Sequence, residues 1–105
     1  MPVPEVDVHQ LATLREAGAV VLDVRNPDEW QSVRLPGVTL IPLGELAEQL
    51  HAVPASEPLY VICAVGGRSA KAAELLRSTG IDAVNVAGGT KAWVEAGYPT
   101  ESGPG

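Results

Sequence analysis

The sequence predicts an α/β domain built on an open, parallel sheet with helices on both of its faces. Two short runs, AVVL at residues 19–22 and LYVI at residues 59–62, are almost purely apolar and rich in β-branched side chains. Such runs are typical of strands that are covered on both faces. Helical patterns separate the runs along the chain, and an alternation of strands and helices favours one sheet with helices packed against it.

Three further segments indicate shorter strands. Residues 39–41 are stopped by Pro42, and residues 83–86 are stopped by the turn sequence AGG. Residues 4–6 favour an edge strand, because proline is tolerated at the edge of a sheet. The chain has 105 residues, which is enough for one domain and too few for two.

Five segments show helical patterns. Asp7 is the expected N-cap of the first helix and Gly18 its C-cap. Asn26 is the expected N-cap of the second, which has Pro27 at its first position. Apolar residues of the third recur at the i, i+3, i+4 and i+7 spacing of an amphipathic helix. The expected helices are 8–17, 26–31, 43–50, 69–78 and 90–96.

The composition is that of a globular domain. Hydrophobic residues make up 46% of the chain and charged residues 19%, which is far from the composition of a disordered segment. We expect a single domain over residues 1–100. The last residues, 101–105, read ESGPG and are expected to form a flexible tail.

The charge pattern does not favour a nucleic-acid partner. The net charge is -6, and the seven lysines and arginines are scattered, whereas a phosphate backbone requires a clustered basic face. No apolar run approaches the ~20 residues of a membrane span, and the first residues lack the features of a signal peptide. These observations predict a protein that binds neither nucleic acid nor membrane. One cysteine cannot form an internal disulfide, so we expect the reducing cytoplasm as the compartment.

Cys63 lies where the predicted strand 59–62 ends, and ligands of open α/β domains collect at that end of the strands. The loop that follows contains Gly66 and Gly67, which permit positive φ angles, and leads into a predicted helix. Its N–H groups can form an anion nest that lowers a cysteine pKa and stabilises an oxyanion or a persulfide. The alternative is that Cys63 is a small buried hydrophobic residue.

Four segments carry a resemblance to one family. The loop CAVGGRS at residues 63–69 resembles the active-site loop of the rhodanese sulfurtransferases, Cys-x-x-Gly-x-Arg-Ser. Three other segments resemble motifs of this family in the same order: LDVRNPDEW at 22–30, LPGVTLIPLGEL at 35–46 and VAGGTKAWVEAGYP at 86–99. The resemblance covers nearly the whole chain and implies the single-domain rhodanese fold, with five parallel strands.

The resemblance implies sulfur transfer. Cys63 would attack the sulfane sulfur of a donor such as thiosulfate, carry it as a persulfide and pass it to cyanide or a thiol, with no metal or organic cofactor. The residues of the persulfide-binding loop would be Ala64, Val65, Gly66, Gly67 and Arg68. A persulfide carrier that acts with a partner protein thiol, or an interaction domain that uses the fold alone, are the alternatives. We expect a monomer.

The length of the loop favours sulfur over phosphate. Four residues separate Cys63 from Arg68, whereas phosphatases and arsenate reductases of the same fold use a loop that is one residue longer and holds a tetrahedral phosphate. Rhodanese loops that favour the thiosulfate dianion often carry an extra cation, whereas Ala64 and Val65 are small and uncharged, so the resemblance implies a donor other than thiosulfate.

Three residues are expected to support the loop: Asp23, Arg25 and Ser69. By resemblance, Asp23 accepts hydrogen bonds from the loop backbone, from Arg68 or from Ser69; capping the turn at Asn26 is an equal alternative. Arg25 and Glu29 are four residues apart and are expected to form an ion pair that orders this segment, with contact to the substrate as the alternative. Ser69 is expected to be the N-cap of the helix that follows the loop.

Other positions are expected to be structural. Gly88 and Gly89 follow a strand at the same end of the sheet as Cys63, where we expect them to allow close packing. His9 and His51 are expected on the surface. Val33 and Arg34 stand where many rhodaneses have Gly-His, a departure that changes the shape of the pocket.

Overall fold

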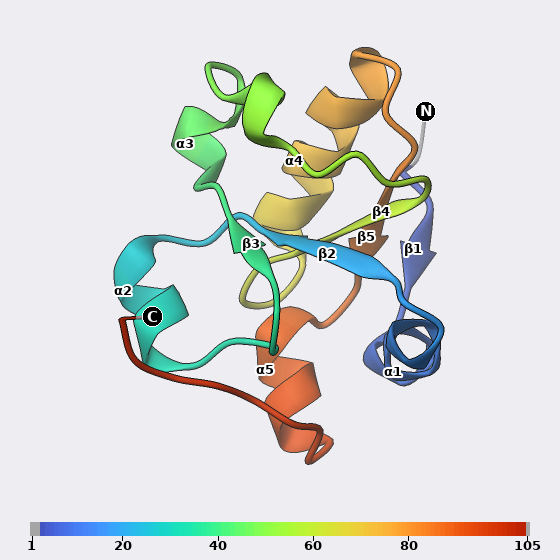
Figure 1. Cartoon of the computed structure of the whole chain (residues 1–105). Helices are drawn as coiled ribbons and strands as arrows, with labels where there is room; N and C mark the ends of the chain where they lie inside the picture. Colours follow the sequence, from blue (N-terminus) through green and yellow to red (C-terminus); the bar gives the residue numbers. More distant parts are fainter. Residues whose placement is uncertain (1–2, 105) are drawn as a thin grey trace.

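The computed structural model describes residues 3–104 and contains a five-stranded sheet (Figure 1). The strand order is β1-β5-β4-β2-β3, and every neighbouring pair is parallel. The strands are β1 Glu5–Val6, β2 Val20–Asp23, β3 Thr39–Leu40, β4 Leu59–Ile62 and β5 Ala83–Val86. The predicted α/β class and the five-stranded parallel sheet are therefore confirmed.

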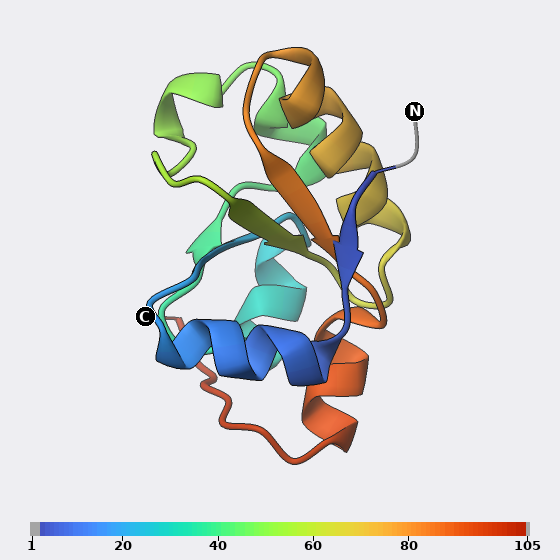
Figure 2. The same ribbon diagram turned by 90° about the vertical axis from the view of Figure 1, so that its right-hand side faces the viewer.

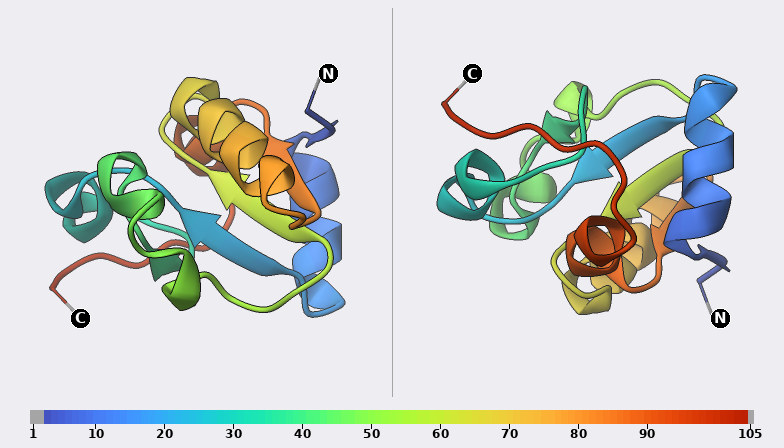
Figure 3. Two further views of the ribbon diagram at one scale, coloured as in Figure 1. Left: turned by 90° about the horizontal axis from the view of Figure 1, so that it is seen from above. Right: turned by 90° about the horizontal axis from the view of Figure 1, so that it is seen from below.

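Helices cover both faces of the sheet (Figures 2 and 3). Helices α3 and α4 lie on one face, α1 and α5 lie on the other, and α2 stands beside the carboxyl end of β2 (Figure 1). The helices are α1 Val8–Glu16, α2 Pro27–Ser32, α3 Leu43–Leu46, α4 Gly67–Ser78 and α5 Gly89–Glu95. Among residues 3–104, no helix combines the length and the apolar composition that a membrane crossing requires.

Strand β4 is buried along its whole length and divides the core into two layers. Leu59 and Val61 pack in the cluster that contains α3 and α4 side chains, while Tyr60 and Ile62 pack in the cluster of α1 and α5. Successive side chains of a strand point to opposite faces. Cys63 continues this alternation and belongs to the α3 and α4 layer.

The predicted N-caps of the first two helices are confirmed, whereas the C-cap of the first helix is Ala17 and not Gly18 as predicted, because α1 ends one residue earlier, at Glu16. The Gln10 N–H donates to Asp7 Oδ1 at 2.8 Å, and the Asp7 N–H donates to Gln10 Oε1 at 2.9 Å, which forms a capping box. Asn26 is the N-cap of α2, and Pro27 is the first residue of that helix. These caps place α2 directly after β2, next to the loop that contains Cys63.

The predicted helix 43–50 is wrong in length. Helix α3 ends at Leu46, and a short 3-10 helix, η1 Leu50–Ala52, follows it. Two causes explain the early end. Gly44 lies inside the first turn and weakens it, and Leu46 is the one residue of α3 that is fully buried, so packing adds little to so short a helix.

The last described residues are held against the domain. Arg34 and Glu101 exchange two backbone hydrogen bonds, of 2.9 and 2.8 Å, and the Gly103 N–H donates to Gln31 O at 2.7 Å. The segment 101–104 thus lies beside α2 (Figure 3), where the sequence led us to expect a flexible tail. Residue 105 of that predicted tail lies outside the described residues.

Candidate functional site

The side chain of Cys63 lies at the carboxyl edge of the sheet, where β4 leads into α4. The residue is 1% exposed. Its Sγ atom lies 3.1 Å from the Gly66 N–H, which donates to it, and 3.2 Å from the Ser69 hydroxyl. The loop therefore curls around the sulfur and directs hydrogen-bond donors at it.

Gly66 makes this curl possible. Its φ angle is +109°, in the left-handed region that favours glycine, and it is the N-cap of α4. Because the cap is Gly66, the helix begins at Gly67 and not at Ser69 as predicted. The amide groups of the first helical turn then lie beside the sulfur, where the positive end of the helix dipole stabilises an anion.

The net effect of these surroundings lowers the pKa of Cys63. Burial disfavours the thiolate and by itself would raise the pKa of the thiol. Hydrogen bonds from the Ser69 hydroxyl and from the backbone N–H groups of Ser69, Gly66 and Val65 favour the thiolate and outweigh burial. A lowered pKa favours the thiolate, which is the nucleophilic form of a cysteine.

The first turn of α5 packs directly on the loop. The Thr90 N–H donates to Cys63 O at 2.8 Å, and the Lys91 N–H donates to Ala64 O at 3.0 Å. At Gly89, where φ is +60°, an added Cβ would lie 2.5 Å from Cys63 O and 2.6 Å from Ala64 C. The predicted role of this glycine pair in close packing is confirmed at Gly89.

Arg68 joins the loop to α2. Its Nη1 and Nη2 atoms donate to the two carboxylate oxygens of Glu29 at 2.7 and 2.8 Å. The bidentate bond to Arg68 lowers the pKa of Glu29 to about 2, and the same bond raises the pKa of Arg68 above its ordinary value. Arg68 thus braces the loop from outside, and its charge is compensated by Glu29.

We expect Glu29→Gln to lower stability only at pH values where Glu29 is charged. Its pKa is about 2 in the folded chain and about 4.3 when unfolded. The contribution of the pair is therefore complete above about pH 5 and is lost as the pH falls toward 2. The pair is partly exposed, so the difference in unfolding free energy should be about 1 kcal/mol or less. Urea unfolding of both proteins across pH measures it; a difference that persists unchanged at about pH 3 would contradict this role.

The predicted partners of Asp23 and Arg25 are wrong. Arg25 forms a bidentate ion pair with Asp23, with Nη2 2.8 Å from Oδ2, and not with the Glu29 carboxylate. The Arg25 N–H also donates to Asp23 Oδ1 at 3.0 Å, so Asp23 is engaged by Arg25 instead of by the loop or by Asn26. Because Asp23 is only two residues away and fully buried, its charge competes better than a carboxylate at the surface.

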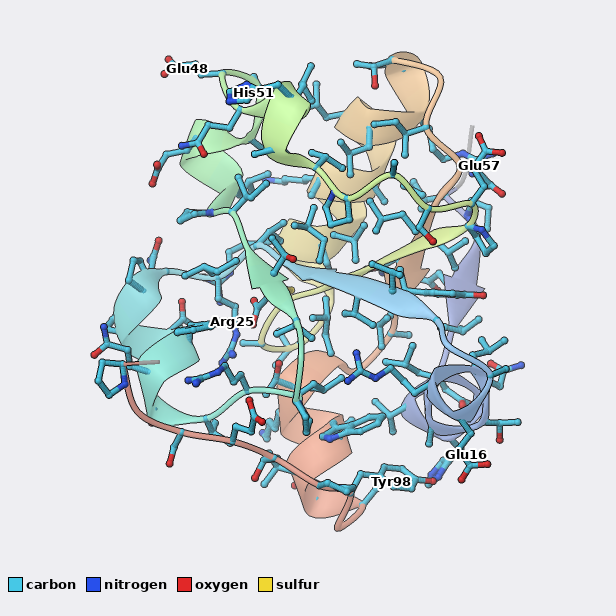
Figure 4. The ribbon with its side chains drawn as sticks, in the orientation of Figure 1. Glu16, Arg25, Glu48, His51, Glu57 and Tyr98 are labelled. Carbon is cyan, nitrogen blue, oxygen red and sulfur yellow. The ribbon has the colours of Figure 1, made fainter. Side chains whose placement is uncertain are left out.

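The pair of Asp23 and Arg25 orders the approach to α2. Arg25 Nη2 donates to Val33 O at 2.7 Å, and Nη1 donates to Glu29 O at 3.3 Å. Figure 4 shows Arg25 between α2 and the sheet. His9 and His51 are exposed, as predicted.

Ser69 has a different role from the predicted N-cap. It is fully buried inside the first turn of α4, and its hydroxyl faces both Cys63 Sγ and, at 2.6 Å, Asn85 Oδ1. Sequence reasoning missed Asn85 altogether. The signal that could have found it is the one strongly polar residue in the otherwise apolar strand AVNV at residues 83–86.

A surface hollow of about 310 Å³ adjoins the loop at Ala64. Its lining residues come from the segments that follow β2, α2 and β4 and from α5, and the surface that they expose to it is mostly apolar. They are Arg25, Val33, Ala64, Thr90, Lys91, Val94 and Glu95. A larger hollow, of about 490 Å³, lies between residues 53–57 and 80–81, at the amino ends of β4 and β5. The smaller hollow is the relevant one, because the carboxyl edge holds Cys63.

The departure at Val33 and Arg34 has a structural explanation. Val33 lines the hollow. Arg34 is buried, with Nη1 donating to Trp30 O at 3.0 Å and to Gly103 O at 2.8 Å, and its guanidinium lies 3.6 Å above the centre of the Trp30 ring. Arg34 therefore serves the packing of the last residues and gives no polar group to the hollow.

These features define an α/β domain that holds a single cysteine, with a lowered pKa, in an amide-lined loop at the carboxyl edge of its sheet. The sequence profile of the rhodanese-like domain matches residues 7–96, and the chain belongs to this family.

Known relatives agree with this assignment. The chain is 34% identical to the thiosulfate sulfurtransferase GlpE of Pseudomonas syringae pv. syringae over 94 residues, which are 89% of this chain and 88% of that protein. It is 36% identical over 74 residues to the candidate sulfur carrier protein YrkF of Bacillus subtilis, which are 70% of this chain and 40% of that protein. The crystal structure of a rhodanese-related protein from Thermoplasma volcanium matches this structure with a TM-score of 0.87 and 36% sequence identity. The match covers 93% of this chain and 97% of that one. The chain spans 40% to 60% of the length of three curated relatives that it matches.

Proposed function

We propose that this chain is a sulfurtransferase that carries sulfane sulfur as a persulfide on Cys63. The observation that carries this proposal is the set of donors at Cys63 Sγ: the Gly66 N–H at 3.1 Å and the Ser69 hydroxyl at 3.2 Å. They stabilise the thiolate, and the other amide groups of the loop are available to the outer sulfur of a persulfide. The reducing cytoplasm is the compartment that keeps this single thiol free.

The reaction has two displacement steps. In the first, the Cys63 thiolate attacks the outer sulfur of thiosulfate; the sulfur–sulfur bond of the donor breaks, and sulfite leaves with the electron pair. In the second, cyanide or a thiolate attacks the outer sulfur of the Cys63 persulfide. The bond within the persulfide breaks, the Cys63 thiolate is restored, and thiocyanate or an acceptor persulfide leaves.

The position of Arg68 supports sulfur transfer over phosphate chemistry. A loop that binds a tetrahedral dianion gains from a guanidinium turned toward its centre. Both Nη atoms of Arg68 are instead engaged by the Glu29 carboxylate on α2. The interior of the loop is therefore lined by N–H groups and one hydroxyl, which suit a single sulfur atom.

A second candidate is a persulfide carrier that works with a partner protein. Two large hydrophobic residues are exposed in the described chain, Val65 at 63% and Val94 at 44%. Val65 lies in the loop itself, and Val94 lines the hollow beside it. Both arginines near the loop are paired, Arg25 with Asp23 and Arg68 with Glu29, so the two exposed valines are suited to contact with an apolar partner surface.

Counting turnovers separates the two candidates. The protein is mixed with thiosulfate and excess cyanide, and thiocyanate is measured against time. We expect continued formation of many thiocyanate molecules per chain. Formation of one molecule per chain, followed by a stop that a partner protein relieves, would favour the carrier. Absence of thiocyanate with both thiosulfate and a thiol persulfide as donor would contradict sulfur transfer.

A further inference from the structure

Asn85 is a polar side chain in the middle of the core. It lies on β5, is 1% exposed, and is paired in register with Val61 of β4 and Glu5 of β1. A buried amide is stable only if its groups are hydrogen-bonded. Its position, next to the residues around Cys63, makes its hydrogen bonds relevant to the site.

The orientation of the Asn85 amide is fixed by two acceptors. Its Nδ2 donates to Glu5 Oε2 at 2.8 Å and to Gly66 O at 3.3 Å. A carboxylate and a carbonyl can only accept, so the NH₂ group must face them. The amide oxygen, Oδ1, consequently faces the Ser69 hydroxyl at 2.6 Å.

Ser69 therefore has two acceptors for one hydrogen. Its hydroxyl can donate to Asn85 Oδ1 at 2.6 Å or to Cys63 Sγ at 3.2 Å, but not fully to both. The shorter contact indicates that Asn85 holds the hydrogen when Cys63 is a neutral thiol, whose S–H can then donate to Ser69 Oγ. When the thiolate forms, the hydroxyl must turn to the sulfur, and Asn85 Oδ1 loses its partner.

We propose that Asn85 is a positioning residue that acts through Ser69: it holds the Ser69 hydroxyl hydrogen while Cys63 carries a proton or a sulfur, and it releases that hydrogen when the thiolate forms. This inference deepens the proposed function and rests on it for its meaning in sulfur transfer. Asn85 thereby disfavours the free thiolate. Asn85 Oδ1 also accepts the hydrogen bond of the Ser69 hydroxyl again once the negative charge has moved to the outer sulfur of the persulfide.

Asn85→Leu tests the proposal. Leucine has a similar shape and leaves Gly66 O bonded to the Ala70 N–H, while Glu5 is exposed to water, so the variant should fold. The Ser69 hydroxyl then has Cys63 Sγ as its remaining acceptor among these groups. Thiolate formation should shift to lower pH, with up to about tenfold more thiolate at a pH below the midpoint, the effect of one hydrogen bond.

The readout is the ultraviolet absorbance of the thiolate as a function of pH, from which the same titration of Cys63→Ser is subtracted to remove the tyrosine signal; the difference reports Cys63, the one cysteine of the chain. Circular dichroism confirms that each variant is folded. A midpoint that stays the same or moves to higher pH in folded Asn85→Leu would overturn the proposal. This variant replaces no charged group: Asp23, Arg25, Glu29, Arg68 and Lys91 keep their charges, and Glu5 keeps its charge but loses the hydrogen bond from Asn85 Nδ2.

A double-mutant cycle separates this role from a general loosening of the core. Ser69→Ala removes the hydroxyl and should move the midpoint to higher pH. If Asn85 acts through Ser69, Asn85→Leu added to Ser69→Ala should cause no further movement. An equal movement in both backgrounds would overturn the proposal.

Glu5 provides a matched pair of variants that spare the core. Glu5→Gln and Glu5→Leu both remove the charge, but the Gln amide oxygen can still accept from Asn85 Nδ2, whereas Leu cannot. The midpoint of Glu5→Leu should lie at lower pH than that of Glu5→Gln, because the freed amide can turn away from Ser69. Equal midpoints would count against the proposal, and none of these readings depends on whether the protein transfers sulfur.

Discussion

Gly89→Ala should lose about 2–5 kcal/mol of stability and most of its sulfur transfer. Two effects add. The φ angle of +60° disfavours any residue with a Cβ by about 1–2 kcal/mol. The new Cβ would also lie within 2.6 Å of backbone atoms of Cys63 and Ala64, which cannot move without opening the loop. Since the total stability of a domain is about 5–15 kcal/mol, the loss should be large in a thermal or urea unfolding experiment.

Gly80→Ala is the matched control. Gly80 also has a positive φ angle, of +93°, but an added Cβ there meets no atom within 4 Å. This variant should therefore lose only the conformational part, about 1–2 kcal/mol, and should keep its sulfur transfer because Gly80 lies at the opposite end of the sheet. Equal losses in the two variants would show that contact between α5 and the loop does not matter.

Cys63→Ser should abolish sulfur transfer while leaving the fold intact. The hydroxyl of serine is similar in size and can keep the hydrogen bonds to Gly66 and Ser69, so the unfolding free energy should change little. Serine, however, cannot form a persulfide, and its hydroxyl is not ionised near neutral pH. Thiocyanate formation should fall to the level of buffer without protein. Residual transfer above that level would mean that Cys63 is not the sulfur carrier.

Apolar runs and N-cap residues were sufficient to predict the buried strands and the first residues of the helices α1 and α2. The apolar run before Cys63 became β4, and Asp7 and Asn26 cap their helices as expected, because burial and capping act within one turn or one strand. The loop around Cys63 could be predicted for the same reason. Its strand, its cysteine, its two glycines and its helix all lie within one short stretch of the sequence.

Side-chain partners could not be predicted, because they depend on contacts between distant segments. Glu29 lies at the right spacing for Arg25, yet it pairs with Arg68, which is 39 residues away in the chain. The sequence favours Ser69 as the N-cap of α4. Gly66 is the N-cap instead, because its positive φ angle lets the helix begin at Gly67. The contact between Asn85 and Ser69 depends on the pairing of β5 with β4, which the local sequence does not contain.

The central claim is that Cys63 carries sulfur, and intact-protein mass spectrometry tests it most directly. The protein is incubated with thiosulfate or a thiol persulfide, desalted, and analysed with and without cyanide, with Cys63→Ser in parallel. We predict a mass gain of one sulfur atom that maps to the Cys63 peptide, disappears with cyanide and is absent from the variant. An unchanged mass with both donors, or the same gain in Cys63→Ser, would contradict the claim.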